Sequence, residues 1–202
     1  MDRSAISWDQ IIAQLADHED LNSLQAQWAM GEILGDRAEK ESIKSFLLGV
    51  QAKGETALEV ESFVSVMYQH CAPISISQRA VDPVGTGGDG ANTINISTTA
   101  AIIARAAGAT VVKHGARAAS SKSGAADLLE ALGVNIDLDG AQVAATVEAV
   151  GIGFCFAPKF HPAMRFAAPA RKELGQASVF NILGPLANPA KPAAESYRDR
   201  SR

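Results

Sequence analysis

Short runs of β-forming residues alternate with alanine-rich helical runs from residue 80 to residue 156, and this alternation most limits the folds open to the chain. The predicted strands cover residues 80–84, 110–113, 134–138 and 152–156, and the predicted helices cover 98–107, 124–132 and 141–150. Strands that are joined through helices run parallel. The pattern therefore predicts an α/β domain in which helices cover a parallel sheet and ligands collect at the carboxyl ends of its strands.

The residues before this region show a different sequence pattern. Residues 7–71 show helical periodicity in four segments that are separated by short polar or glycine-containing breaks. The predicted signals are a capping box at Ser7 with Gln10, a stop at Gly35, a cap at Asp36, a stop near Gly54 and a cap at Thr56. We therefore expect residues 1–71 to form a small all-helical domain in front of the α/β domain.

Composition and charge exclude several classes of protein. The 202 residues are 47% apolar and 20% charged, with a net charge of -4, which argues against a general nucleic-acid binder. Cys71 and Cys155 lack the spacing of a zinc site or a disulfide framework. No apolar leader or stretch of about 18 apolar residues occurs. We expect a cytoplasmic protein that binds neither membrane nor nucleic acid.

The strongest chemical signal is the glycine-rich turn at residues 85–90, GTGGDG, which follows the first predicted strand. Glycines serve tight turns as often as ligands, but they also let backbone amides approach an anion closely. Asn95–Thr98 opens the next helix, with Ser97 or Thr98 as its expected cap, and Lys113, Ser120, Ser121 and Lys122 follow. This spacing favours a phosphate-binding surface. The turn matches neither a Walker A motif nor a dinucleotide fingerprint.

Four further residues can each have either a structural role or a role in ligand binding. His114, at the end of a predicted strand, and His161 are as readily structural histidines as ligand contacts. Arg165 and Arg171 can fork onto a carboxylate, although helical arginines are usually solvated or paired at the surface. Asp89, within the glycine turn, can orient amides, a ribose hydroxyl or a hydrated magnesium ion.

Several ordered motifs together resemble one family. The segments VDPVGTGGDGANTINIST, KHGARAASSKSGAADLLEALG, FAPKFHPAMRFAAPARKELG and FNILGPLANPA are similar to those of the anthranilate phosphoribosyltransferases of tryptophan biosynthesis. The resemblance implies a nucleoside phosphorylase/phosphoribosyltransferase-like fold, with a helical dimerisation domain at 1–71 and an α/β domain for phosphoribosyl pyrophosphate at 72–192. It also implies a homodimer.

The resemblance implies a transfer of the phosphoribosyl group from phosphoribosyl pyrophosphate to anthranilate, with Mg²⁺ and without a catalytic side chain. Positioning and electrostatics carry such a reaction. Ser97 matches a magnesium ligand. The donor-binding positions fall on Gly85, Gly88, Asp89, Thr93, Asn95, Ile96, Ser97, Thr98, Lys113, Ser120 and Ser121. The anthranilate-binding positions fall on Gly85, His114, Ala116, His161 and Arg171.

The sequence departs from the family at three places. Ala116 stands where the family usually has asparagine, and Ala125 stands where it has a serine that contacts the donor. After about Pro192 the chain leaves the pattern, so we expect a C-terminally truncated α/β domain that lacks an Asp-Glu magnesium pair, and a disordered tail at 193–202. The competing readings are a non-catalytic dimerising remnant and a related phosphorylase or nucleic-acid-binding paralogue.

Overall fold

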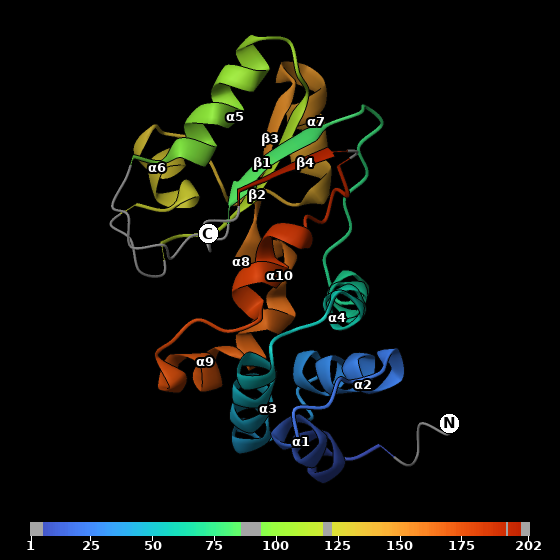
Figure 1. The fold of residues 1–202 in the computed structure, drawn as a ribbon. Helices are drawn as coiled ribbons and strands as arrows, with labels where there is room; N and C mark the ends of the chain where they lie inside the picture. The colour runs from blue at the N-terminus through green and yellow to red at the C-terminus, as the bar shows by residue number, and fades with distance from the viewer. Residues whose placement is uncertain (1–5, 86–93, 119–122, 193, 199–202) are drawn as a thin grey trace. The chain divides into compact units, whose positions relative to one another are not determined.

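The computed structural model describes residues 6–85, 94–118, 123–192 and 194–198. The chain divides into two compact units (Figure 1). Unit 1 comprises Met1–Cys71 and Ala163–Leu183, and unit 2 comprises Ala72–Pro162 and Gly184–Arg202. The first is helical and the second contains a parallel sheet, so the predicted fold class is confirmed.

Unit 1 is built from helices. They are α1 (Trp8–Ala16), α2 (Ser23–Leu34), α3 (Lys40–Lys53), α4 (Ala57–Gln69) and α9 (Ala168–Leu174). Helix α3 contacts α1 and α9, and α2 contacts α4. A 3-10 helix (Pro162–Phe166) and α10 (Phe180–Leu186) each begin in one unit and end in the other. Within the described ranges, no helix is long and apolar enough to cross a membrane.

Aromatic rings form the centre of unit 1. The ring centroid of Trp8 lies 5.2 Å from that of Trp28 and 5.9 Å from that of Phe46. Phe46 in turn meets Phe63 edge-to-face at 5.8 Å, and both phenylalanines are fully buried. Such tilted pairs add to the free energy that burial of the rings already contributes. These contacts tie α1, α2, α3 and α4 into one core.

Two of the predicted helix caps are confirmed and one is wrong. The Ser7 hydroxyl caps α1 by accepting a hydrogen bond from the Gln10 amide at 3.4 Å, but the reciprocal bond of the predicted capping box is not formed among the described residues. Thr56 forms a complete capping box. Asp36, by contrast, does not cap α3, which begins after Glu39 without a side-chain cap. Asp36 has a positive φ of 58° and belongs to the turn that follows α2. Aspartate tolerates this left-handed conformation better than most residues.

Unit 2 contains a four-stranded parallel sheet in the order β3-β2-β1-β4. The strands are β1 (Val81–Gly85), β2 (Val111–Gly115), β3 (Ile152–Phe156) and β4 (Ala194–Arg198). The helices are α5 (Ile96–Ala106), α6 (Ala125–Ala131), α7 (Gly140–Val150) and α8 (Ala157–Phe160). Three strands and three of these helices correspond to predicted elements.

Two predictions for unit 2 are wrong. Residues 134–138 do not form a strand, because the Asp137 amide bonds the Asn135 side chain at 2.9 Å instead of a neighbouring strand. The expected disordered tail contains β4, which pairs with all five residues of β1. The backbone of β1 has donors and acceptors on both sides, and a parallel partner satisfies those that face away from β2.

Helices cover the sheet on both faces, as alternate residues of β3 show. The Phe154 side chain packs with Ala126 of α6 and with Ile136. The side chain of the next residue, Cys155, packs with Val143 and Val147 of α7. Successive strand side chains point to opposite faces, so α6 and α7 lie on opposite sides of the sheet (Figure 1).

Candidate functional site

The carboxyl ends of β1 and β2 are where the sequence predicts phosphate binding. Gly85, the last residue of β1, is exposed, and a Cβ atom placed on it would meet no atom of the described residues within 4 Å, its chain neighbours aside. Of the predicted donor contacts, Gly88, Asp89, Thr93, Ser120 and Ser121 lie outside the described residues. The structure therefore reports on Gly85, on the start of α5 and on the end of β2.

Helix α5 begins at this edge with a side-chain cap. The Asn95 side-chain oxygen accepts a hydrogen bond from the Thr98 amide at 3.1 Å, so Asn95 is the cap in place of Ser97 or Thr98. The Ser97 hydroxyl donates to the same oxygen at 3.5 Å. The Thr98 hydroxyl is buried and has no hydrogen-bond partner among the described residues. The free amides and dipole of a helix start favour an anion.

The oxygen donors at the start of α5 fit magnesium in a limited way. The described residues contain no group of three or more His, Cys, Asp or Glu side chains that could hold a metal ion. They do place the Ser97 hydroxyl beside the Asn95 amide oxygen. Magnesium is usually held by one or two protein oxygens together with substrate phosphates and water. The donor set therefore suits an ion that arrives with a phosphorylated ligand.

Buried polar side chains join the ends of β1 and β2. Lys113 is 3% exposed and donates from Nζ to the Pro83 carbonyl at 2.7 Å. The Asp82 carboxylate accepts from the His114 amide at 3.2 Å and from the Asn188 side chain at 2.8 Å. Burial raises the pKa of Asp82 to about 6, although the charge of Lys113 and these hydrogen bonds lower it. For Lys113, burial lowers the pKa, and the charge of Asp82 partly offsets this effect.

The two predicted histidines lie together. The ring centroids of His114 and His161 are 5.2 Å apart in an edge-to-face arrangement. His114 Nδ1 lies 3.2 Å from the Gly184 carbonyl, and His161 Nε2 lies 2.7 Å from the Ala187 carbonyl. A carbonyl only accepts, so these nitrogens carry the protons. The other ring nitrogen of His114, Nε2, is buried without a partner among the described residues and keeps a free lone pair.

We expect His114 to stay neutral through the physiological pH range. Its pKa is lowered to about 3, mainly by burial and in smaller part by the nearby His161 and Lys113. The unfolded chain takes up the proton first, at about pH 6.5, so this group makes unit 2 less stable as the pH falls below that value. NMR titration of the ring carbons, assigned with His114→Gln, should show no midpoint between pH 5 and 8. A midpoint near 6.5 would contradict the buried neutral state.

Asp127 bonds the backbone on either side of the segment that contains the predicted serine contacts. Its carboxylate accepts from the Ala118 amide at 2.9 Å and from the Gly124 amide at 2.7 Å, and these bonds lower its pKa. The two amides flank residues 119–122, which include Ser120 and Ser121. Ala116 lies just before this segment, is exposed and accepts through its carbonyl from the Ala126 amide at 3.2 Å.

The remaining predicted residue, Arg171, belongs to unit 1. It lies on α9, and its guanidinium stands 5.2 Å from the centre of the Phe180 ring. Among the residues important at the site, Asp82, Asn188 and Asp127 were not predicted. A signal existed for two of them, because an Asp-Pro pair inside a strand is unusual and Asp127 stands three residues after the glycine that precedes α6.

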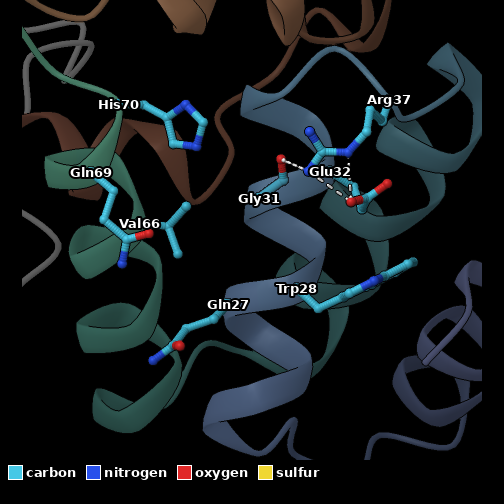
Figure 2. Close-up of a pocket in the computed structure, with 8 residues that line it drawn as sticks. All are labelled: Gln27, Trp28, Gly31, Glu32, Arg37, Val66, Gln69 and His70. Atoms are coloured by element: carbon cyan, nitrogen blue, oxygen red, sulfur yellow. Dashed lines mark hydrogen bonds and ion pairs between the residues drawn. The ribbon is translucent and has the colours of Figure 1, made fainter. Parts of the chain in front are cut away.

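A cavity of about 370 Å³ lies in unit 1, between α2 and α4 (Figure 2). Its lining includes Trp28, Glu32, Arg37 and His70, and none of the predicted site residues. The Arg37 guanidinium already bonds Glu32 at 2.9 Å and the Gly31 carbonyl at 3.1 Å. This charge is therefore satisfied within the protein, and the cavity is separate from the candidate site.

Both units match models of one family. Residues 9–71 match the helical bundle domain of the glycosyl transferase family, and residues 77–196 match its a/b domain. The anthranilate phosphoribosyltransferase of Rhodococcus jostii is 52% identical over 192 residues, covering 95% of this chain and 53% of the relative. That of Nocardia farcinica is 53% identical over 184 residues, covering 91% and 53%. The chain thus spans about half the length of these curated relatives.

Solved structures agree with this assignment. The anthranilate phosphoribosyltransferase of Thermus thermophilus superposes with a TM-score of 0.88 at 40% identity, covering 93% of this chain and 57% of that one. The Saccharomyces cerevisiae enzyme in complex with PRPP and Mg gives 0.84 at 27% identity, covering 98% and 60%. On the match of both domain models, the chain belongs to the glycosyl transferase family.

Proposed function

We propose that the chain serves the transfer of a phosphoribosyl group from phosphoribosyl pyrophosphate to anthranilate. In this reaction the bond between ribose C1 and pyrophosphate breaks, a bond from C1 to the anthranilate nitrogen forms, and that nitrogen loses a proton. The products are N-(5-phosphoribosyl)anthranilate and pyrophosphate. The observation that carries the proposal is the 52% identity to an anthranilate phosphoribosyltransferase over 95% of this chain.

On the donor side, the residues at the strand ends bind and orient the phosphates. The Asn95 side-chain oxygen occupies the Thr98 amide, and the other amides at the start of α5 are the proposed donors to an anion. Lys113 provides a cation beside the end of β1. Ser97 would hold Mg²⁺, which neutralises the departing pyrophosphate. Gly85, Gly88, Asp89, Thr93, Ile96, Thr98, Ser120 and Ser121 are the further proposed contacts.

On the acceptor side, His114 contributes a polar nitrogen while it stays neutral, because its pKa is lowered to about 3. An aromatic amine is already neutral at pH 7, so the reaction needs orientation more than a strong base. Neutral His114 presents the Nε2 lone pair as an acceptor for an amine or an ordered water. We assign Gly85, Ala116, His161 and Arg171 to anthranilate binding with it. Alanine at 116 offers no side-chain hydrogen bond, which distinguishes this chain from relatives with asparagine there.

We further propose a cytoplasmic homodimer that associates through unit 1. The buried thiol of Cys155 suits a reducing compartment. Size-exclusion chromatography with light scattering should give twice the mass of 21.1 kDa. A dimer that binds no donor would favour the alternative function, a non-catalytic dimerising module, and a monomer would remove the dimer from the proposal.

Donor binding by this chain is the direct test. Isothermal titration with phosphoribosyl pyrophosphate and Mg²⁺ should give heat, and Ser97→Ala should weaken binding by about 10–100-fold, since a hydrogen bond or ion contact of a charged group is lost. Omission of Mg²⁺ should weaken binding to the unchanged chain and affect the variant less. A fluorescence assay of anthranilate consumption then reports whether transfer follows binding.

Thr99→Ala is the matched control, because Thr99 lies on the same turn of α5 but is exposed and bonds only the Asn95 carbonyl through its hydroxyl. Binding by this control should remain within about twofold of the unchanged chain. Equal losses in both variants would assign the effect to the helix start in general. Absence of heat at millimolar donor would refute the proposed function for this chain.

A further inference from the structure

A proline interrupts β1 in the interior of the sheet. Strand β1 lies between β2 and β4, yet Pro83 at its centre has no backbone N–H to donate. Pairing between β1 and β4 nevertheless runs through all five residues of β1, whereas pairing between β1 and β2 is limited to Val81 with Val111. The hydrogen-bonded ladder between β1 and β2 therefore ends at the proline.

The register identifies the two bonds that are missing. The Val81 amide donates to the Thr110 carbonyl at 3.0 Å, so the backbone groups of Pro83 face β2 as well. In a regular parallel ladder, residue 83 would donate to the Val112 carbonyl and the His114 amide would donate to the residue 83 carbonyl. The proline prevents the first bond, and the second is not made.

Side chains take the place of both bonds. The Asn188 side-chain amide donates to the Val112 carbonyl at 2.8 Å. The His114 amide donates to Asp82 at 3.2 Å, and the Pro83 carbonyl accepts from Lys113 Nζ at 2.7 Å. The three backbone groups that the broken ladder leaves open at Pro83 thus each have a new partner, in accordance with the rule that buried polar groups are hydrogen-bonded.

These replacements are buried and linked to one another. Asp82 and Asn188 are both 0% exposed, and the Asn188 amide donates to the Asp82 carboxylate at 2.8 Å. Asn188 is itself held by the Ala190 amide, which donates to its side-chain oxygen at 2.9 Å. A buried aspartate is costly unless it is bonded and balanced by charge, and Lys113 supplies that charge.

We propose that Asp82 and Asn188 are positioning residues that replace the β1–β2 ladder and thereby fix Lys113 and His114 relative to the end of β1. A continuous ladder would draw the two strand ends together at Pro83. With the ladder replaced, the Lys113 ammonium reaches the β1 backbone two residues before Gly85, where the glycine turn begins. The role toward the donor rests on the proposed function, whereas the ladder replacement does not.

The test uses Asn188→Ala, Pro83→Val and the double variant of the full chain. Asn188→Ala should lower the Tm, because the Val112 carbonyl and Asp82 lose their hydrogen bonds with the Asn188 side-chain amide. Valine at 83 supplies an N–H that faces the Val112 carbonyl, so the double variant should regain most of the lost Tm. Donor binding should respond differently. The affinity measured with phosphoribosyl pyrophosphate and Mg²⁺ should fall about tenfold or more in Asn188→Ala and should not recover in the double variant.

The different responses of the Tm and of the donor affinity separate a positioning role from a purely stabilising one. A donor affinity that recovers together with the Tm, or that Asn188→Ala leaves unchanged, would overturn the positioning role. A double variant that gains no Tm over Asn188→Ala would overturn the ladder replacement. If the unchanged chain binds no donor, the proposed function fails and the positioning role toward the donor fails with it, while the Tm comparison still decides the ladder replacement.

Asp82→Asn provides a second arm in case Asn188→Ala does not fold. It keeps the size and one oxygen of the side chain but removes the charge from the bond with the His114 amide. The amide proton of residue 114 should move upfield in the NMR spectrum, because a charged acceptor binds more strongly. Donor affinity should also fall at least about fivefold, because the carboxylate that favours the charged form of buried Lys113 is lost. An unmoved amide signal or an unchanged affinity would count against the proposal.

Discussion

Replacement of Glu59 by alanine is expected to lower the free energy of unfolding of unit 1 by about 3–5 kcal/mol. Glu59 is 0% exposed and accepts hydrogen bonds from the Leu21 amide at 2.9 Å and from the Thr56 amide at 2.8 Å. It also pairs with Lys53 at 2.9 Å, whose side chain is only 4% exposed. The alanine variant leaves the buried Leu21 amide without this partner and removes one carboxylate from the nearly buried Lys53 ammonium. Chemical denaturation followed by tryptophan fluorescence measures the loss.

The pH dependence of unfolding provides an independent check on Glu59. Burial raises its pKa, but the hydrogen bonds from Thr56, Leu21 and Lys53 outweigh burial, so the folded-state pKa lies below its usual value. The stabilisation from Glu59 is therefore complete above about pH 4.3, the unfolded value, and is lost as the pH falls through the folded-state pKa. The alanine variant should lack this part of the acid sensitivity. The control, Glu61→Ala, changes an exposed residue of the same helix and should cost less than about 0.5 kcal/mol.

Replacement of Phe160 by alanine should destabilise unit 2 by about 3–5 kcal/mol. Phe160 is 0% exposed and packs with Val112, Val143 and Cys155 beneath the sheet. Loss of the ring leaves a cavity in this core. Phe160 directly precedes His161 in the sequence. We therefore expect a lower Tm together with a weaker bond between the His161 ring and the Ala187 carbonyl. Calorimetry measures the first effect and NMR of the His161 ring the second.

Phe156→Ala is the matched control for this change. Phe156 is only half-buried, stacks on Phe154 at 6.4 Å and carries the Arg117 guanidinium at 4.9 Å. Its loss should cost clearly less than that of Phe160, because part of the ring already faces solvent. Equal losses in the two variants would show that the core beneath β2 and β3 is not where unit 2 gains most of its stability.

Local sequence signals predicted much of the fold. Residues 152–156 form β3 with the predicted limits, and Thr56 caps α4 as its spacing to Glu59 indicates. Signals within a few residues suffice for such elements, since periodicity and capping are local. Residues 134–138 and β4 were misassigned because pairing with a distant strand decides whether an extended or polar segment belongs to a sheet.

The candidate site was predictable only in part. The family motifs placed Asn95, Lys113, His114 and His161 near the expected ligands, and the structure brings the two histidines together. Asp82 and Asn188 escaped prediction because they are 106 residues apart in the sequence and meet only when unit 2 is folded. A proline within a strand marks the place where such a partner is needed, but does not say which residue provides it.

The order of the two units along the chain has a consequence for folding. Most of unit 2, Ala72–Pro162, is inserted between the two segments of unit 1. The Ala72 amide donates to the Phe160 carbonyl at 2.7 Å, so the ends of this insertion are held together when unit 2 is folded. Closing an unfolded loop of about 90 residues costs about 4 kcal/mol by chain-length scaling. Folding of unit 2 removes most of this entropic cost from the docking of α9 on α3, and the two units should therefore melt as one cooperative transition.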